Sequence, residues 1–405
     1  MRQLSKLIYI LFFAILYGCT DPYALQTNTF EDILVVEATL TNELKKQEIK
    51  ISRTFKLEET EPSIETNATV YVTDDLGNQF NFEEMSGKYI SEFEFQAFPD
   101  REYQLYINTN SGKQYTSTRE KLTTINNLTL LEATVKNKFG VNGVDITANS
   151  YDPSGTSKYY RYEYEETYKI IVPFWAPDSL QIYGNSENFS VNPMQIEYAF
   201  TQHQRTGESK TCYKTEVSND IILENTTLTG EDRIKDYSIR FISQDNYSIA
   251  NRYSIKVRQY IQSIASYTYY KTLRDLSASG NVLSPSQPGF INGNISSVEN
   301  KNEKVIGFFD VSSVSEKRIF FNYQDLFPGE PEPPYFYDCQ ISTYDRTKKK
   351  TQSITPFDGL TYLVTNTRSG KIILYQREDP LFKMVPPQCG DCRTVGSNIV
   401  PAFWQ

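Results

Sequence analysis

The sequence predicts a mainly β protein, with an N-terminal Ig- or transthyretin-like β-sandwich followed by a larger β-rich domain with one or two packed helices. Two observations lead to this fold class. The chain holds 30 Tyr and 24 Phe, and together with Val, Ile and Thr these dominate over Ala and Leu, a composition that favours strands. Short alternating apolar runs also recur about every 8–12 residues between turn residues, as in β-sandwiches.

The first series of alternating runs lies within residues 31–120. In the run 68–73, Ala68, Val70 and Val72 share one face, while the residues between them share the other. Turn residues separate the runs at 74–78, 86–87, 99–100 and 111–112. The strands expected here lie at 33–36, 48–52, 68–73, around 80–82, at 89–95, at 103–107 and around 115. Residues 31–120 are therefore predicted to form one sandwich of about seven strands.

Residues 121–405 are predicted to form the larger domain. The run 159–165 alternates aromatic and charged residues, so that Tyr160, Tyr162 and Tyr164 share one face. A second strand is expected at 253–261, and it leads into the best helix candidate of the chain, at 264–277.

The predicted helix carries an apolar stripe that packs across the sheet. Residues Ala265, Tyr269, Leu273 and Leu276 fall at helical spacing. Ser263 is suited to cap the start of the helix and Gly280 to end it.

Two proline-rich segments are expected to run over the surface. They span 284–294 and 327–337, and the second mixes four prolines with acids and aromatics. Such loops often carry binding sites, but for each loop alone we slightly favour a rigid connector without a partner.

The N-terminus has the layout of a bacterial lipoprotein signal. Arg2 and Lys6 precede an apolar run over 7–17, and Gly18 stands directly before Cys19. The run is too short to span a bilayer and is typical of a signal peptide. We expect residues 1–18 to be removed, Cys19 to carry a diacylglycerol, and residues 19–30 to form a tether. An ordinary signal peptide or a buried helix would leave the Gly-Cys placement unexplained.

The charge of the chain argues against a nucleic-acid partner. Formal net charge is -9, and loss of Arg2 and Lys6 leaves 39 basic and 50 acidic residues, about -11. Such a surface gains nothing from phosphate backbones or anionic membranes, so the lipid on Cys19 must attach the protein to its membrane. The single histidine, His203, makes His-dependent catalysis and His-rich metal sites implausible.

Four cysteines remain after processing: Cys212, Cys339, Cys389 and Cys392. An even number in an exported chain predicts disulfides rather than a zinc site or a redox motif. The C-x-x-C at 389–392 follows two prolines near the C-terminus, without a thioredoxin-like setting. Of the three pairings, we favour Cys389–Cys392 with Cys212–Cys339. The competing arrangement joins one of the two tail cysteines to Cys339.

The chain carries no recognised catalytic motif: no G-x-S-x-G, no H-E-x-x-H, no P-loop and no G-x-G-x-x-G. Adjacent acids such as Glu83-Glu84 and Glu165-Glu166 point to opposite faces of a strand and make no catalytic pair. We therefore predict no catalytic residues, no metal and no cofactor. Carboxylates that converge from distant strands, as in a glycosidase, stay open from sequence alone.

Several segments, taken in order, resemble one family of Bacteroidota lipoproteins, the domain of unknown function 4249. They are the signal ending at Cys19, ILVVEATLTN, IKISRT, YRYEYEETY, CYKTEVSNDIILENT, YSIKVRQYIQSIASYTYYKTL, NGNISSVENKNEKVIGFFDVSSV and CGDCRTVGSNIVPAFW. The resemblance implies a two-part β-rich lipoprotein of the outer membrane, accessory to a TonB-dependent receptor in nutrient or peptide uptake. It carries no catalytic residues to transfer.

Three functions follow as hypotheses. The first is a non-catalytic binding or accessory component of TonB-dependent uptake, acting through the larger domain. The second is a surface structural or adhesive lipoprotein, and the third is a carboxylate-dependent hydrolase. Asp21 alone after Cys19 does not decide between the periplasmic and the outer face of the membrane.

Overall fold

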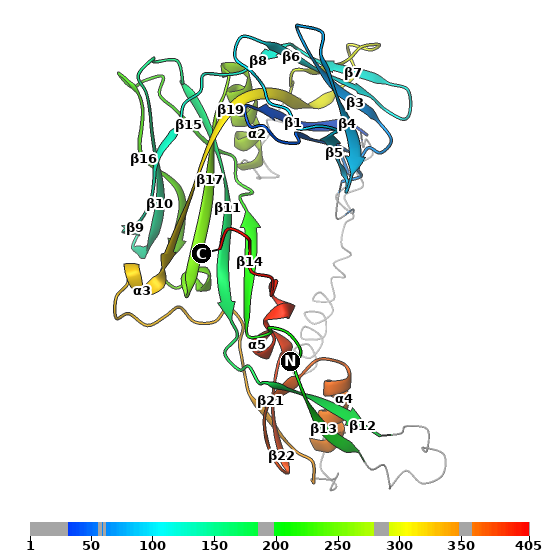
Figure 1. Cartoon of the computed structure of the whole chain (residues 1–405), viewed down its shortest axis with the longest axis vertical. Coiled ribbons are helices and arrows are strands. Elements are labelled where there is room, and N and C mark those ends of the chain that lie inside the picture. The colour runs from blue at the N-terminus through cyan, green and yellow to red at the C-terminus, as the bar shows by residue number, and fades with distance from the viewer. Residues whose placement is uncertain are drawn as a thin grey trace, which may run out of the picture.

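The computed structural model describes residues 31–55, 59, 62–184, 198–278, 291–347 and 359–404. These residues form an elongated arrangement of three β-rich units (Figure 1). We call them the first unit, at the upper right of the figure, the tall middle unit, and the lower unit at the bottom. The mainly β fold class is confirmed.

The first unit contains the strands expected between residues 31 and 120. They are β1 (Leu34–Thr41), β2 (Glu48–Arg53), β3 (Thr69–Asp74), β4 (Gln79–Met85), β5 (Lys88–Ser91), β6 (Glu102–Asn108), β7 (Gln114–Ser117) and β8 (Glu120–Lys121). The sheet runs in the order β1-β2-β5-β4-β3-β6-β7 and encloses one core. Val70 and Val72 are buried in that core, as their alternation predicts.

A late segment of the chain completes the first unit. Strand β18 (Ile295–Ser297) pairs with β7, and the first half of β19 (Val305–Asn322) pairs in parallel with β1. Phe309 and Val311 of β19 lie in the same core as the strands of residues 34–117. The domain boundary predicted near residue 120 stays a prediction. The structure adds that strands from residues 295–312 complete the first unit.

The middle unit is a two-layer sandwich. One layer holds β11 (Tyr159–Ile171), β14 (Thr211–Val217), β15 (Ile222–Asn225), β17 (Arg252–Ile261) and the second half of β19. The other holds β9 (Leu128–Lys138), β10 (Val141–Asp152) and β16 (Asp232–Ser243). Tyr160 and Tyr162, which share one face of β11 as predicted, are buried between the layers, and Arg161 on the opposite face is buried too, at 7% exposure.

Short helices and one long helix flank this sandwich. They are η2 (Tyr247–Ile249), α2 (Ile264–Ala278) and α3 (Tyr323–Leu326). Helix α2 confirms the predicted helix, and Ser263 Oγ accepts a hydrogen bond from Ser266 N at 3.1 Å, as a cap does. Gly280 and residues 284–290 lie outside the described residues.

The predicted stripe of α2 is partly wrong. Ala265 is exposed, and the buried face is centred on Tyr267 and Tyr269. The helix packs through ring contacts, with Tyr267 against Tyr159 at 5.0 Å and Tyr269 against Phe308 at 5.5 Å between centroids. Large aromatic rings outweigh a small alanine in setting which face of a helix is buried.

The sequence pattern did not predict the lower unit as separate from the rest of residues 121–405. It holds β12 (Asp178–Tyr183), β13 (Ala199–Gln204), β20 (Ser342–Asp345), α4 (Gly359–Arg368), β21 (Ile373–Glu378) and β22 (Leu381–Val385). Its buried core is small: Leu180, Leu363, Leu374, Phe382 and Met384. Within the described ranges, no helix combines the length and the apolar character needed to cross a bilayer.

Candidate functional site

The chain crosses between the middle and lower units four times. It leaves after β11, returns before β14, leaves again over 327–341, and returns over 386–397 through α5 (Pro387–Gly390) and η3 (Cys392–Thr394). The 386–397 segment contacts each of the other three crossing segments. Cys389 O accepts from Phe174 N at 2.9 Å, Cys392 N donates to Ser209 O at 2.9 Å, and Tyr335 Oη donates to Gln388 O at 2.7 Å. We call this meeting point the lower joint.

Two disulfides close the lower joint, Cys212–Cys392 and Cys339–Cys389. The favoured pairing of Cys389 with Cys392 is therefore wrong. The competing arrangement, in which a tail cysteine is joined to Cys339, is the one observed.

The local backbone explains the correction. Cys389 lies in α5 and Cys392 in η3, and Asp391 between them is extended, with φ -143° and ψ 104°. The change of direction at Asp391 separates the two side chains, so one reaches the 327–341 segment and the other the edge strand β14. Each disulfide thus ties the last returning segment to a different crossing.

An aromatic surface lies on the second outgoing crossing. It consists of Tyr335, Phe336 and Tyr337, which pack on the buried ring of Tyr247 in η2. Ring centroids are 4.9 Å apart for Tyr247–Tyr335, 5.1 Å for Tyr247–Phe336 and 4.8 Å for Phe336–Tyr337. Phe336 and Tyr337 are each 45% exposed. Because Tyr335 is held by Gln388 and Cys339 is bonded to Cys389, these rings are held firmly in place.

The surroundings of the aromatic surface are acidic. Glu330, Glu332 and Asp338 flank it, and the sequence has no Lys or Arg from residue 319 to residue 345. Burial raises the pKa of the Tyr335 hydroxyl, and it raises that of Tyr247 despite a hydrogen bond from Ile171 N. Both phenols therefore stay neutral at physiological pH, and the surface offers aromatic faces beside negative charge.

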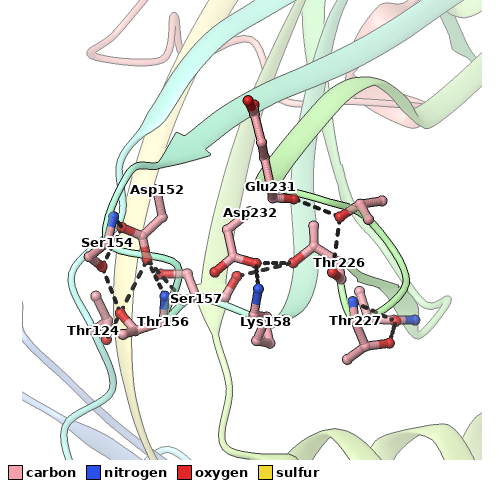
Figure 2. A network of polar contacts seen from close by, with 12 residues as sticks. Thr124, Asp152, Ser154, Thr156, Ser157, Lys158, Thr226, Thr227, Glu231 and Asp232 are labelled. Carbon is pink, nitrogen blue, oxygen red and sulfur yellow. Dashed lines mark hydrogen bonds and ion pairs between the residues drawn. The ribbon is translucent and has the colours of Figure 1, made fainter.

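A second candidate site is a polar pocket at the start of α2. It has a volume of about 400 Å³ and lies among three segments, 121–124, 156–159 and 261–264. Thr124, Thr156 and Lys158 line it, and Figure 2 shows that the same three side chains belong to a polar network at the ends of β10 and β16.

Asp152 organises one half of that network. Its carboxylate accepts five hydrogen bonds, from the backbone and hydroxyl of Ser154, the backbone and hydroxyl of Thr156, and the backbone of Ser157 (Figure 2). Burial alone would raise the pKa of Asp152, but these hydrogen bonds lower it well below its ordinary range. Asp152 is therefore ionised and fixes the turn that presents Thr156.

Asp232 organises the other half. It lies opposite Asp152 in the register of β10 and β16, is fully buried, and pairs through Oδ1 with Lys158 and with Thr226 Oγ1. The two aspartates are thus used to fix loops, and neither lines the pocket. Asp152 and Asp232 are two buried carboxylates that lie close together, but both accept hydrogen bonds that hold loops in place.

The remaining predicted residues are dispersed. Cys19 lies outside the described residues. Glu165 pairs with Arg318 at 2.6 Å, whereas Glu166 pairs with Arg240 at 3.3 Å on the other face of the strand. His203 is exposed on β13, beside Thr201. In the described part of the chain, no three or more His, Cys, Asp or Glu residues gather as metal ligands.

Sequence reasoning singled out the 327–337 loop but missed Tyr247. Tyr247 is far from the loop in sequence, and only the tertiary fold brings its ring against Tyr335. No sequence signal identifies this contact.

The family is shown by comparison with known proteins. The profile described as "Domain of unknown function (DUF4249)" matches residues 20–318. The chain belongs to the DUF4249 family. The match covers the first unit and ends within β19, so the aromatic surface on 335–337 and three of the four paired cysteines lie beyond it. No curated protein matches the chain.

Proposed function

We propose that this DUF4249 protein is a lipid-anchored outer-membrane lipoprotein that acts as a non-catalytic accessory or binding component of a TonB-dependent uptake system. The observation that carries the proposal is the aromatic surface, whose exposed rings are held by a disulfide and by the Tyr335–Gln388 hydrogen bond. The signal ending at Cys19 supplies the membrane attachment.

The aromatic surface has the properties of a protein-binding site. In the free protein, exposed Phe and Tyr rings contact water rather than other apolar groups, which is unfavourable. Such rings are enriched at protein–protein interfaces. Because Phe336 and Tyr337 are already fixed by their neighbours, a partner that covers them immobilises few additional side chains.

The position of the surface fits a partner that extends away from the lipid. A chain of 12 residues from Cys19 to residue 31 spans at most about 40 Å, so the tether keeps the first unit near the membrane. The segment that follows α3 lies at the end of the middle unit opposite the first unit (Figure 1). A membrane receptor with large external or periplasmic loops is suited to contact both ends.

Attachment and partnership are tested in the same cells. Wild type should incorporate labelled palmitate and sediment with outer membrane, whereas Cys19→Ser should do neither. Protease treatment of intact cells then reports which face carries the protein. Purification from solubilised outer membrane should recover a TonB-dependent β-barrel with the wild type; repeated recovery of the anchored protein without any barrel would reject the accessory role.

A surface structural or adhesive role is the second candidate, because three units joined at the two ends of a tall middle unit are suited to act as spacers (Figure 1). The two functions separate in the same experiment. An adhesive lipoprotein would be cleaved from intact cells by protease and would be purified without a barrel.

A further inference from the structure

We propose that the aromatic surface binds a segment of the receptor that carries arginine side chains. The inference rests on the proposed function for the identity of the partner, and it adds the chemistry by which that partner is recognised. Three features of the surface carry it: exposed rings without a cation of their own, carboxylates without an ion pair, and a stiff backbone that holds both in place.

The rings of the aromatic surface are accessible from solvent. Ring centroids are 4.5 Å apart for Tyr335–Phe336, 4.8 Å for Phe336–Tyr337 and 6.3 Å for Tyr335–Tyr337, so the three form one continuous group. Phe336 and Tyr337 are each 45% exposed. Because the face of an aromatic ring is electrostatically negative, it attracts a cation that lies within about 6 Å of the ring centre. These rings can therefore bind a cationic side chain.

The chain covers other rings with its own cations. Arg233 Cζ lies 3.9 Å from the centre of the Tyr151 ring, and Arg318 Cζ lies 3.6 Å from the centre of the Phe403 ring. Among the described residues, no lysine or arginine side chain lies over the three rings of the aromatic surface. We infer that the cation for this surface comes from a partner.

Two carboxylates beside the rings determine the charge of the ligand. Asp338 follows Tyr337 directly in the sequence. Burial, together with the negative charge of Glu332, raises the pKa of the Tyr247 hydroxyl, so Glu332 lies close to the ring on which the surface packs. Both carboxylates are exposed, and neither forms an ion pair with another described residue. Their charge favours a cationic ligand over a neutral apolar one or an anionic one.

The backbone that carries these groups is stiff. Pro331 and Pro333 stand on either side of Glu332, and Pro333 is buried. A proline ring fixes φ, and the residue before a proline is restricted to extended conformations. At the other end of the surface, Cys339 is bonded to Cys389. Because rings and carboxylates are already ordered, a ligand that binds them pays little additional conformational entropy.

Arginine suits this surface better than lysine does. Its guanidinium group is planar, so it can stack on a ring while its N–H groups donate hydrogen bonds to a carboxylate alongside. It is also less strongly hydrated than an ammonium group, so covering it is less costly. We therefore expect the receptor segment to place at least one arginine between the rings and the two carboxylates.

Saturation-transfer difference NMR on the full mature chain tests the ligand chemistry. The probes are acetyl-Gly-Arg-Gly-Arg-Gly-amide and the same peptide with citrulline, a neutral group of the same shape, in place of arginine. We expect the arginine peptide to bind at least about fivefold more tightly, with the strongest saturation on the CH₂ groups next to the guanidinium, and to bind more weakly as NaCl is raised. Phe336→Ala with Tyr337→Ala should remove the preference for arginine.

A second pair of variants tests the carboxylates while the rings stay in place. Glu332→Gln with Asp338→Asn should weaken binding of the arginine peptide by about threefold, the effect of exposed charges, and leave binding of the citrulline peptide unchanged. Both positions are exposed, so the fold should not change. Glu83→Gln with Glu132→Gln removes two exposed charges from other strands and is the matched control, which should bind as wild type does.

The same peptides separate this inference from the proposed function. An excess of the arginine peptide should release the barrel from the immobilised chain, whereas the citrulline peptide should not. A barrel that is recovered but not released by the arginine peptide rejects the ligand chemistry and leaves the accessory role standing. A chain that binds the peptide but recovers no barrel rejects the receptor as the partner. The inference is also overturned if wild type binds both peptides equally, or if Glu332→Gln with Asp338→Asn binds the arginine peptide as tightly as wild type.

Discussion

The two joints of the molecule are built in opposite ways. At the upper joint, between the first and middle units, one strand runs through both: β19 pairs with β1 over 305–312 and with β17 over 313–322. At the lower joint, within the described residues, no strand is shared between the main sheet and the sheets of the lower unit. Four crossings meet there, and two disulfides tie them together. The upper joint depends on backbone pairing and the lower one on covalent bonds.

The difference follows from the size of the cores. The first and middle units each enclose an extended core and can share a strand between them. The lower unit has a small core, and small domains commonly need disulfides to stay folded. The aromatic surface lies at the lower joint, so its order depends on those disulfides, whereas the polar pocket at the start of α2 lies beside the upper joint and does not depend on them.

The largest effect is expected from removing the disulfide between β14 and η3. Cys212→Ser with Cys392→Ser should cost about 2–5 kcal/mol of unfolding free energy, the usual range for a native disulfide. Hydrogen exchange should rise in the lower unit and around Tyr335, while β1 and β19 stay protected. Equal loss of protection in both joints would contradict the comparison.

Substitution of Gly307 should weaken the upper joint. A Cβ there would lie 2.4 Å from Val36 O, and its φ of +152° is one that other residues rarely adopt. Gly307→Ala should cost about 2–3 kcal/mol through a clash and backbone strain. Urea unfolding measures it, and Gly329→Ala, where the Cβ meets open space, is the control for the positive φ alone.

The Asp152 network at the end of β10 should respond to pH. In Asp152→Asn, the amide NH₂ faces backbone N–H donors, so we expect a loss of about 1–2 kcal/mol at pH 7. The pKa of Asp152 is lowered in the folded state, so its stabilisation is fully present above about pH 4 and is lost as pH falls further. Urea unfolding at several pH values should show the two proteins converging below pH 4; a constant difference would contradict this role.

The smallest effect is expected for the ion pair that joins the two upper units. Glu43 of the first unit contacts Arg258 of β17, and Arg258 also lies 3.4 Å from Glu316. Glu43→Gln should cost less than about 1 kcal/mol, because the pair is partly exposed and Arg258 keeps Glu316. Thermal unfolding at low and high salt checks this; a large loss would mean that charge, and not β19, holds the upper joint.

Local pattern predicted the elements but not their assembly. The alternation around Val70 and Val72 and the Ser263 cap were readable from sequence, because strand faces and helix caps are decided within a few residues. The return of residues 295–312 to the first unit was not, since strand pairing across 270 residues leaves no local mark. The cysteine pairing failed for a related reason: neighbours in sequence are directed apart by the extended backbone at Asp391.

Recovery of the receptor by variants of the aromatic surface tests the central claim most directly. Wild type, Phe336→Ala with Tyr337→Ala, and the control Phe93→Ala, an exposed ring of the first unit, are purified from solubilised outer membrane and the barrel in each sample is quantified. We predict that the double variant recovers at least about tenfold less barrel, as loss of an interface hot spot does, and that the control matches wild type. Equal recovery by all three proteins would contradict the assignment of this surface to the receptor.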